Sequence, residues 1–134
     1  APDAPVEPWI SVNPNHVEIN AAEEFDDPDS VYTFYKKLIA MRHNNATIAT
    51  GEWNLVAADS EQVYSFTRTS GDDTILVIVN LTDRTAQVPA EVAQLLEDGV
   101  GESQVLLSTY DAMHSVKSIA RGELARWEGV VIQL

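Results

Sequence analysis

The run Ile75-Leu76-Val77-Ile78-Val79 decides the fold of this 134-residue chain. All of its side chains are apolar and most are β-branched, so it predicts a strand that is buried on both faces and lies at the centre of a sheet. Ser70-Gly71-Asp72 before it and Thr82-Asp83-Arg84 after it are turns by composition, and they are short enough to require antiparallel neighbours. The fold is therefore expected to be mainly β, with a meander around this strand.

Outward from this run, short segments with a period of two predict further strands from Gly51 to the end of the chain. Residues 89–101 predict one or two helical turns instead. We expect an antiparallel, Greek-key-like β-sandwich of seven or eight strands over residues 51–134. The expected strands are Glu52–Ala57, Gln62–Thr69, Thr74–Asn80, Thr85–Pro89, Gln104–Thr109, a segment around Ser118–Arg126, and Glu128–Leu134.

One amphipathic α-helix is expected before the sheet, from Pro28 to about His43. Asp27 can accept hydrogen bonds from its first-turn amides, and Pro28 suits the first helical position. Helical spacing gathers the apolar side chains on one wide arc, which predicts packing against a large surface. These side chains are Val31, Tyr32, Phe34, Tyr35, Leu38, Ile39 and Met41. Arg42 falls inside the arc. We favour the interpretation that it ties the helix end to a neighbouring loop over the interpretation that it contacts a substrate.

Composition excludes several classes of partner. The formal net charge is −13 with only eight Lys and Arg side chains, so nucleic acid and anionic membranes are not expected to bind. The longest apolar run is far shorter than the roughly 20 residues of a membrane-spanning helix. Cys is absent, which excludes disulfides, thiolate metal sites and a Cys nucleophile, and fits a reducing compartment. We therefore expect a soluble, cytoplasmic protein.

No arrangement of polar residues in the sequence indicates a catalytic or metal site. His16, His43 and His114 are far apart, and none belongs to a metal-binding motif. The acid pairs Asp72-Asp73 and Glu97-Asp98 lie in expected turns, where neighbouring carboxylates are usually solvated. The run of acids from Glu23 to Asp29 is likewise expected to be solvated rather than to bind a cation. We expect no catalytic residue, no cofactor and no metal within this chain.

The tryptophans Trp9, Trp53 and Trp127 remain as candidates for a binding role. Aromatic side chains on a β-sandwich can stack on sugar rings, but they also fill cores and interfaces. Packing is the favoured interpretation of all three residues.

Several segments, taken as a series, resemble a known family. Residues 8–15, Pro-Trp-Ile-Ser-Val-Asn-Pro-Asn, followed by Glu18-Ile19-Asn20, are similar to the "PWxxVNPNyxxIN" segment of bacterial α-glucosidases of the oligo-1,6-glucosidase type, in the α-amylase superfamily. The similarity continues through residues 27–31, 35–42, 63–69 and 76–81. Ala125-Arg126-Trp127-Glu128 resembles the family's closing "LrPyEa".

This resemblance implies that the chain is the C-terminal region of a larger enzyme. Residues 1–50 would be the last loop and last helix of a (β/α)₈ catalytic barrel, and residues 51–134 a C-terminal β-sandwich that packs on the barrel and stabilises it. The family hydrolyses α-1,6- or α-1,4-linked gluco-oligosaccharides with retention, using an Asp nucleophile, a Glu acid/base and a third Asp. Those acids belong to motifs upstream of this region, so the resemblance gives no residue here a catalytic role.

Two other interpretations stay open. The chain could be a free-standing carbohydrate-binding β-sandwich, or the same tail from a sucrose isomerase or trehalulose-forming relative. A stabilising domain predicts that Trp53 and Trp127 are buried, whereas a binding module predicts that they are exposed in a row. Without its barrel, the apolar helix face should either fold back on the sandwich or self-associate.

Overall fold

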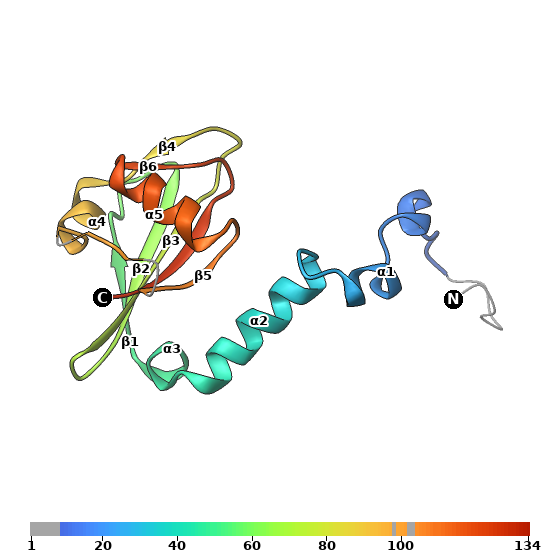
Figure 1. Cartoon of the computed structure of the whole chain (residues 1–134), viewed down its shortest axis with the longest axis horizontal. Coiled ribbons are helices and arrows are strands. Elements are labelled where there is room, and N and C mark those ends of the chain that lie inside the picture. Colours follow the sequence, from blue (N-terminus) through green and yellow to red (C-terminus); the bar gives the residue numbers. More distant parts are fainter. Residues whose placement is uncertain (1–8, 98, 102–103) are drawn as a thin grey trace. The chain divides into compact units, whose positions relative to one another are not determined.

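The computed structural model describes residues 9–97, 99–101 and 104–134. The chain divides into two compact units, Ala1–Lys36 and Lys37–Leu134, and the boundary between them lies within a helix (Figure 1).

The first unit consists of short helices joined by capped turns. A 3₁₀ helix, η1 (Pro14–Val17), is followed by α1 (Ala21–Asp26) and by the beginning of α2 (Val31–Asn44). The acidic run expected to be solvated forms α1 and the turn after it, and most of its side chains are exposed.

The long helix α2 begins at Val31 rather than at the expected Pro28. Ser30 takes the capping role that the sequence assigns to Asp27, since its Oγ accepts a hydrogen bond from the amide of Thr33 at 3.1 Å. The same hydroxyl donates to the carbonyl of Asp27 at 2.9 Å, and Ser30 is buried. The turn that contains Pro28 is therefore held outside the helix.

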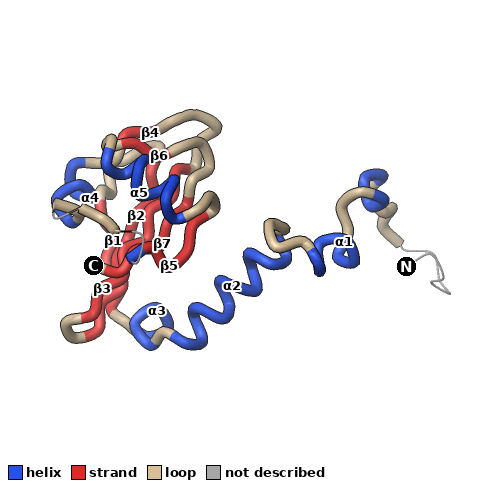
Figure 2. The backbone as a smooth tube through the Cα atoms, in the orientation of Figure 1, coloured by secondary structure: helices blue, strands red, loops and turns tan. Residues whose placement is uncertain are grey.

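The second unit is built on a five-stranded antiparallel sheet with strand order β1-β2-β3-β7-β5 (Figure 2). Its strands are β1 (Glu52–Val56), β2 (Val63–Ser70), β3 (Asp73–Asn80), β5 (Val105–Ser108) and β7 (Gly129–Gln133). A two-stranded sheet pairs β4 (Ala86–Gln87) with β6 (Glu123–Leu124). Three helices complete the unit: α3 (Ala46–Thr50), α4 (Ala90–Leu95) and α5 (Ala112–Ala120).

The expected meander is confirmed for β1, β2 and β3, with β3 at the centre of the sheet. The antiparallel pairing expected across Thr82-Asp83-Arg84 is wrong, because β4 pairs with β6 in the second sheet and the other neighbour of β3 is β7. The helical turns expected within residues 89–101 are also confirmed, as α4. The strand expected around Ser118–Arg126 is wrong, because residues up to Ala120 belong to α5 and only Glu123 and Leu124 pair as a strand. The two observed sheets do not by themselves establish a Greek-key sandwich of seven or eight strands, which stays a prediction.

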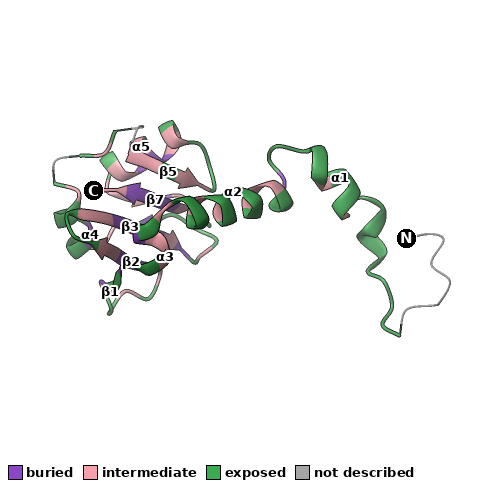
Figure 3. Cartoon of the chain, turned by 90° about the horizontal axis from the view of Figure 1, so that it is seen from below, coloured by how far each residue is buried: buried purple, intermediate pink, exposed green. Residues whose placement is uncertain are grey.

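The hydrophobic core lies on one face of the five-stranded sheet, which we call the inner face. It carries Val63 from β2, Leu76 and Ile78 from β3, and Val130 and Ile132 from β7. The elements that cover it contribute Ala86, Val92, Leu124 and Ile119, from β4, α4, β6 and α5. Figure 3 shows the buried residues gathered in the strands, while α2 has no buried residue. No helix in the described part of the chain is long and apolar enough to cross a membrane.

Candidate functional site

The opposite face of the sheet, which we call the outer face, is also apolar. Strand register aligns a row of side chains across all five strands: Leu55, Phe66, Val77, Val131 and Leu107. Side chains two residues apart on a strand share a face, so Trp53, Tyr64 and Ile75 belong to the same surface. The ring of Phe66 lies 6.4 Å from that of Trp53 and 5.7 Å from that of Tyr64. The outer face is therefore a continuous apolar surface, although nearly half of the Trp53 and Tyr64 side-chain area is exposed.

A groove of about 370 Å³ lies between part of this face and the segment that includes the end of α2 and α3. Leu38, Met41 and Ile48 line it on the helical side. The apolar arc of α2 is therefore only partly used in this chain: Leu38 and Met41 are half-buried beside the sheet, whereas Ile39 remains 55% exposed.

Polar contacts fasten α3 to the sheet at one end of the groove. Asp73 on β3 accepts a hydrogen bond from the hydroxyl of Thr47 and another from Nε2 of Gln133, on β7. A Cβ on Gly51 would lie 2.5 Å from the carbonyl oxygen of Thr47, on α3, and 3.0 Å from that of Thr69, on β2, so only glycine fits between the end of α3 and β2. The position of α3 is thus fixed by side-chain and backbone contacts together.

The two arginines of the groove bind backbone carbonyls. Arg42 Nη1 donates to the carbonyl of Ile48 at 3.5 Å, so this arginine ties the end of α2 to the helix α3 rather than to the expected loop. Arg68 Nη1 donates to the carbonyl of Gly51 at 2.7 Å. Both guanidinium groups therefore have a local structural contact.

The candidate histidines and acids do not come together. His16 lies in η1 with its Nδ1 2.9 Å from the carbonyl of Asn13, and His43 is exposed in the last turn of α2. The expectation that Asp73 is solvated in a turn is wrong, because it begins β3, is partly buried and belongs to the α3 anchor. Asp98 lies outside the described residues. Among the residues that the structure describes, no group of three His, Cys, Asp or Glu side chains could hold a metal ion.

A buried carboxylate that the sequence analysis missed lies beneath α5. Glu128 is fully buried; its Oε1 accepts a hydrogen bond from Ser115 Oγ at 2.7 Å, and its Oε2 accepts one from the amide of Ala125 at 2.6 Å. His114 Nε2 lies 3.9 Å from Oε2, and Ser108 Oγ lies 2.8 Å from Ser115 Oγ. Because Ser115 and Glu128 are enclosed, this cluster can fasten α5 to the turn before β7 but cannot reach a substrate.

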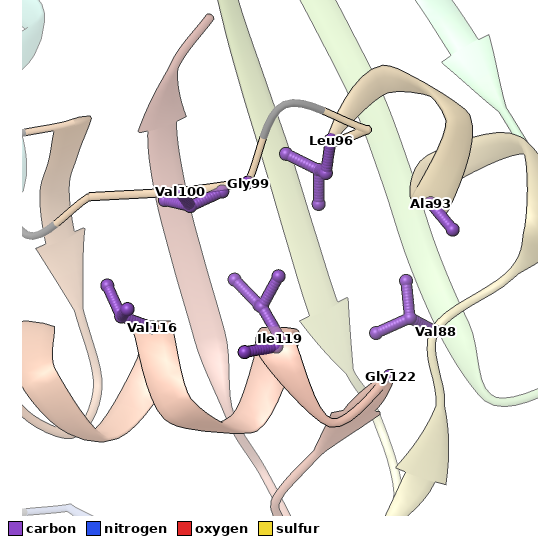
Figure 4. A pocket seen from close by; sticks show the side chains of 9 residues that line it. Val88, Ala93, Leu96, Gly99, Val100, Val116, Ile119 and Gly122 are labelled. Atoms are coloured by element: carbon purple, nitrogen blue, oxygen red, sulfur yellow. The ribbon is translucent and has the colours of Figure 1, made fainter.

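A second pocket, of about 280 Å³, lies between α4 and α5 (Figure 4). Val88, Leu96, Val116 and Ile119 point into it. All of its lining residues are apolar or glycine, so it holds no group for acid-base chemistry. It is an extension of the inner-face core.

The tryptophans match neither expected pattern. Trp127 is 57% exposed and Trp53 is 48% exposed, so neither is buried within this chain. They also do not form a row: Trp53 is in register with Ile75 at one end of β3, while the Trp127 amide donates to the carbonyl of Thr82 beyond the other end. The length of a strand, roughly 20 Å, separates these two positions.

Comparison with known proteins identifies the family. Residues 3–51 match the model of the α-amylase catalytic domain. Oligo-1,6-glucosidases from Parageobacillus thermoglucosidasius and Bacillus cereus are each 33% identical to the chain over 129 residues, which is 95% and 96% of this chain and 22% of each relative. The chain belongs to the α-amylase superfamily.

Solved structures of this superfamily include a close structural match. The trehalulose synthase MutB from Pseudomonas mesoacidophila MX-45 has a TM-score of 0.71 and 30% identity, over 95% of this chain and 22% of MutB. The chain thus spans about a fifth of the length of these relatives. The catalytic-domain match ends at Gly51, and β1 begins at the next residue.

In this α-amylase superfamily chain, the asparagines of the motif that suggested the family have local structural roles. Asn13 Oδ1 accepts a hydrogen bond from the amide of Asn15 at 3.3 Å and caps η1. Asn20 Oδ1 accepts from the amides of Ala22 and Glu23, each at 3.1 Å, and caps α1. These asparagines therefore fix the path of the backbone through the first unit.

Proposed function

We propose that this chain is the C-terminal region of a retaining α-glucosidase of the oligo-1,6-glucosidase type. Residues 1–50 would complete a catalytic barrel, and residues 51–134 would form a stabilising C-terminal β-sandwich. The observation that carries the proposal is similarity to oligo-1,6-glucosidases along 95% of the chain. The longer protein would act on α-1,6- or α-1,4-linked gluco-oligosaccharides in the cytoplasm, with catalytic carboxylates outside this chain.

The outer face of the sheet is the surface that we assign to the catalytic barrel. A protein-protein contact of this kind is expected to have an apolar centre that excludes water. Phe66, Val77 and Val131 form such a centre, and the more exposed Trp53 and Tyr64 lie beside them. Packing the barrel here would bury the apolar area that the chain alone leaves open, which is a stabilising contribution.

A second function has its own supporting observation. MutB, which matches the chain in structure, is a trehalulose synthase, and one of its structures contains the substrate sucrose. The same tail could therefore belong to an enzyme that isomerises sucrose. The chain matches an oligo-1,6-glucosidase and a trehalulose synthase at similar identity, 33% and 30%, so the tail alone does not separate the two reactions.

The test is to sequence the coding region upstream of Ala1 and to express the complete protein. We expect the three carboxylate motifs of the barrel in the same reading frame. Incubated with isomaltose, the complete protein should release glucose first as the α-anomer, which proton NMR detects directly. Conversion of sucrose to an isomeric disaccharide would support the sucrose isomerase alternative. A start codon without barrel motifs, or a complete protein inactive on isomaltose, maltose and sucrose, would contradict the enzyme proposal.

A further inference from the structure

The turn between β6 and β7 is closed by a buried side chain. The amide of Glu128 donates to the carbonyl of Ala125 at 3.2 Å, and the Glu128 carboxylate accepts from the amide of Ala125 at 2.6 Å. Because Glu128 is also bonded to Ser115 on α5, the turn is fixed to the body of the domain. Arg126 and Trp127 lie between the two closing residues, and both are exposed.

Trp127 is held in a backbone conformation that large side chains rarely adopt. Its φ angle is 55°, in the left-handed region. Its amide donates to the carbonyl of Thr82 at 3.0 Å, and its carbonyl accepts from Thr109 Oγ1 at 3.2 Å. Backbone strain of this kind persists where surrounding contacts enforce it, and it is frequent at ligand sites. Here the enforced conformation holds an indole ring that is 57% exposed.

A second aromatic side chain is attached to the same turn. The hydroxyl of Tyr110 donates to the carbonyl of Arg126 at 3.0 Å, and its ring stacks on His114 with centroids 4.4 Å apart and planes 12° from parallel. Tyr110 is 42% exposed. We call Tyr110, Arg126 and Trp127 the end platform, since they lie at the end of the sheet opposite Trp53.

We propose that the end platform binds a neutral oligosaccharide. Sugar rings present an apolar C–H face that packs on exposed aromatic rings, while their hydroxyls accept hydrogen bonds from a guanidinium such as that of Arg126. The net charge of −13 disfavours acidic polysaccharides. Since the turn is already rigid, binding orders few additional groups, which favours affinity. That the sugar is an α-linked glucan rests on the proposed function; the platform itself does not.

In the experiment, maltoheptaose and isomaltoheptaose are each titrated into the 134-residue chain, and binding is measured by calorimetry and Trp fluorescence. We expect saturable binding with a dissociation constant of about 1 mM. Trp127→Gly removes the ring and tolerates the positive φ, and it should weaken binding about tenfold. Trp9→Ala is the matched control because it removes an indole that is 95% exposed outside the platform, and binding should be unchanged.

Arg126→Ala is a second variant that changes an exposed side chain only, and it should weaken binding several-fold. Circular dichroism of each variant checks the fold. Absence of saturable binding to any sugar, or binding that Trp127→Gly leaves unchanged, would overturn the proposal. Trp127-dependent binding of xylohexaose without binding of either α-glucan would support the platform and would overturn only the inference that its sugar is an α-linked glucan.

Discussion

The two faces of the five-stranded sheet carry similar residues and have different surroundings. On β3, Leu76 and Ile78 face the core and are fully buried, whereas Val77 and Val79 on the outer face are only partly covered. Ile75, also on the outer face, is fully buried at the end of the strand near α3, so the outer face is open in its middle and not at that end. All five are apolar neighbours on the strand that decides the fold. An apolar run therefore indicates that both faces of its sheet are covered, but not whether the covering elements belong to the same chain.

The polar contacts of the two faces differ as well. On the inner-face side, Ser65 donates to the carbonyl of Val56 at 2.8 Å, and Glu128 and Ser115 are hydrogen-bonded below α5. Across the described residues, no buried side-chain nitrogen or oxygen lacks a partner. The middle of the outer face is a row of apolar side chains instead. The inner face thus has the specific contacts of a completed core, while the outer face has the character of a surface for association.

The largest expected loss of stability distinguishes substitutions at two adjacent residues of β3. Ile78→Ala should lower the free energy of unfolding by about 3–4 kcal/mol, because it leaves a cavity in a fully enclosed site. Val77→Ala should cost about 1 kcal/mol, since its site is partly open and the smaller side chain leaves a gap that water can fill. Urea denaturation of both variants measures the difference, and equal losses would contradict the contrast between the faces.

The next largest loss of stability is expected when the hydrogen bonds of Glu128 beneath α5 are removed. Glu128→Ala should destabilise the chain by about 3 kcal/mol, because the hydroxyl of Ser115 and the amide of Ala125 lose their common acceptor in a buried site. Glu97→Ala is the matched control, since it removes an exposed glutamate of the same size and should change the stability by less than about 0.5 kcal/mol. Comparable urea midpoints for the two variants would show that the network does not hold α5 to the β7 turn.

The parts of this fold that could be predicted from the sequence depend on local patterns. The apolar run at 75–79 and the turn before it, Ser70-Gly71-Asp72, determine β2, β3 and their antiparallel pairing. Arg42 at the end of an amphipathic helix indicated a local backbone contact; the structure shows one, although its acceptor, Ile48, lies in α3 and not in a loop. In each case the deciding interactions lie within a few residues or within one hairpin.

The features that were not predicted from the sequence depend on contacts between segments that are distant along the chain. Ser115 and Ser118 are polar yet buried on α5, so the sequence pattern alone would not assign them to the packed side of this helix. Their burial is possible only because Glu128 and His114 provide partners, a pairing that no local pattern reveals. The exposure of Trp53 and Trp127 likewise depends on which elements cover the sheet, which composition does not encode.

The smallest expected loss of stability in this chain is that of a substitution on the outer face. The same substitution in the longer protein tests what covers this face. Tyr64 is 43% exposed, so Tyr64→Ser should lower the stability of the 134-residue chain by only about 0.5–1 kcal/mol. In the longer protein, where we propose that the barrel packs on this face, the same substitution should cost about 2–3 kcal/mol, because it removes apolar area from an interface. Parallel urea denaturation of the two proteins, each against its own unsubstituted form, measures this ratio. An equally small loss in both would mean that the outer face stays open and that the barrel packs elsewhere.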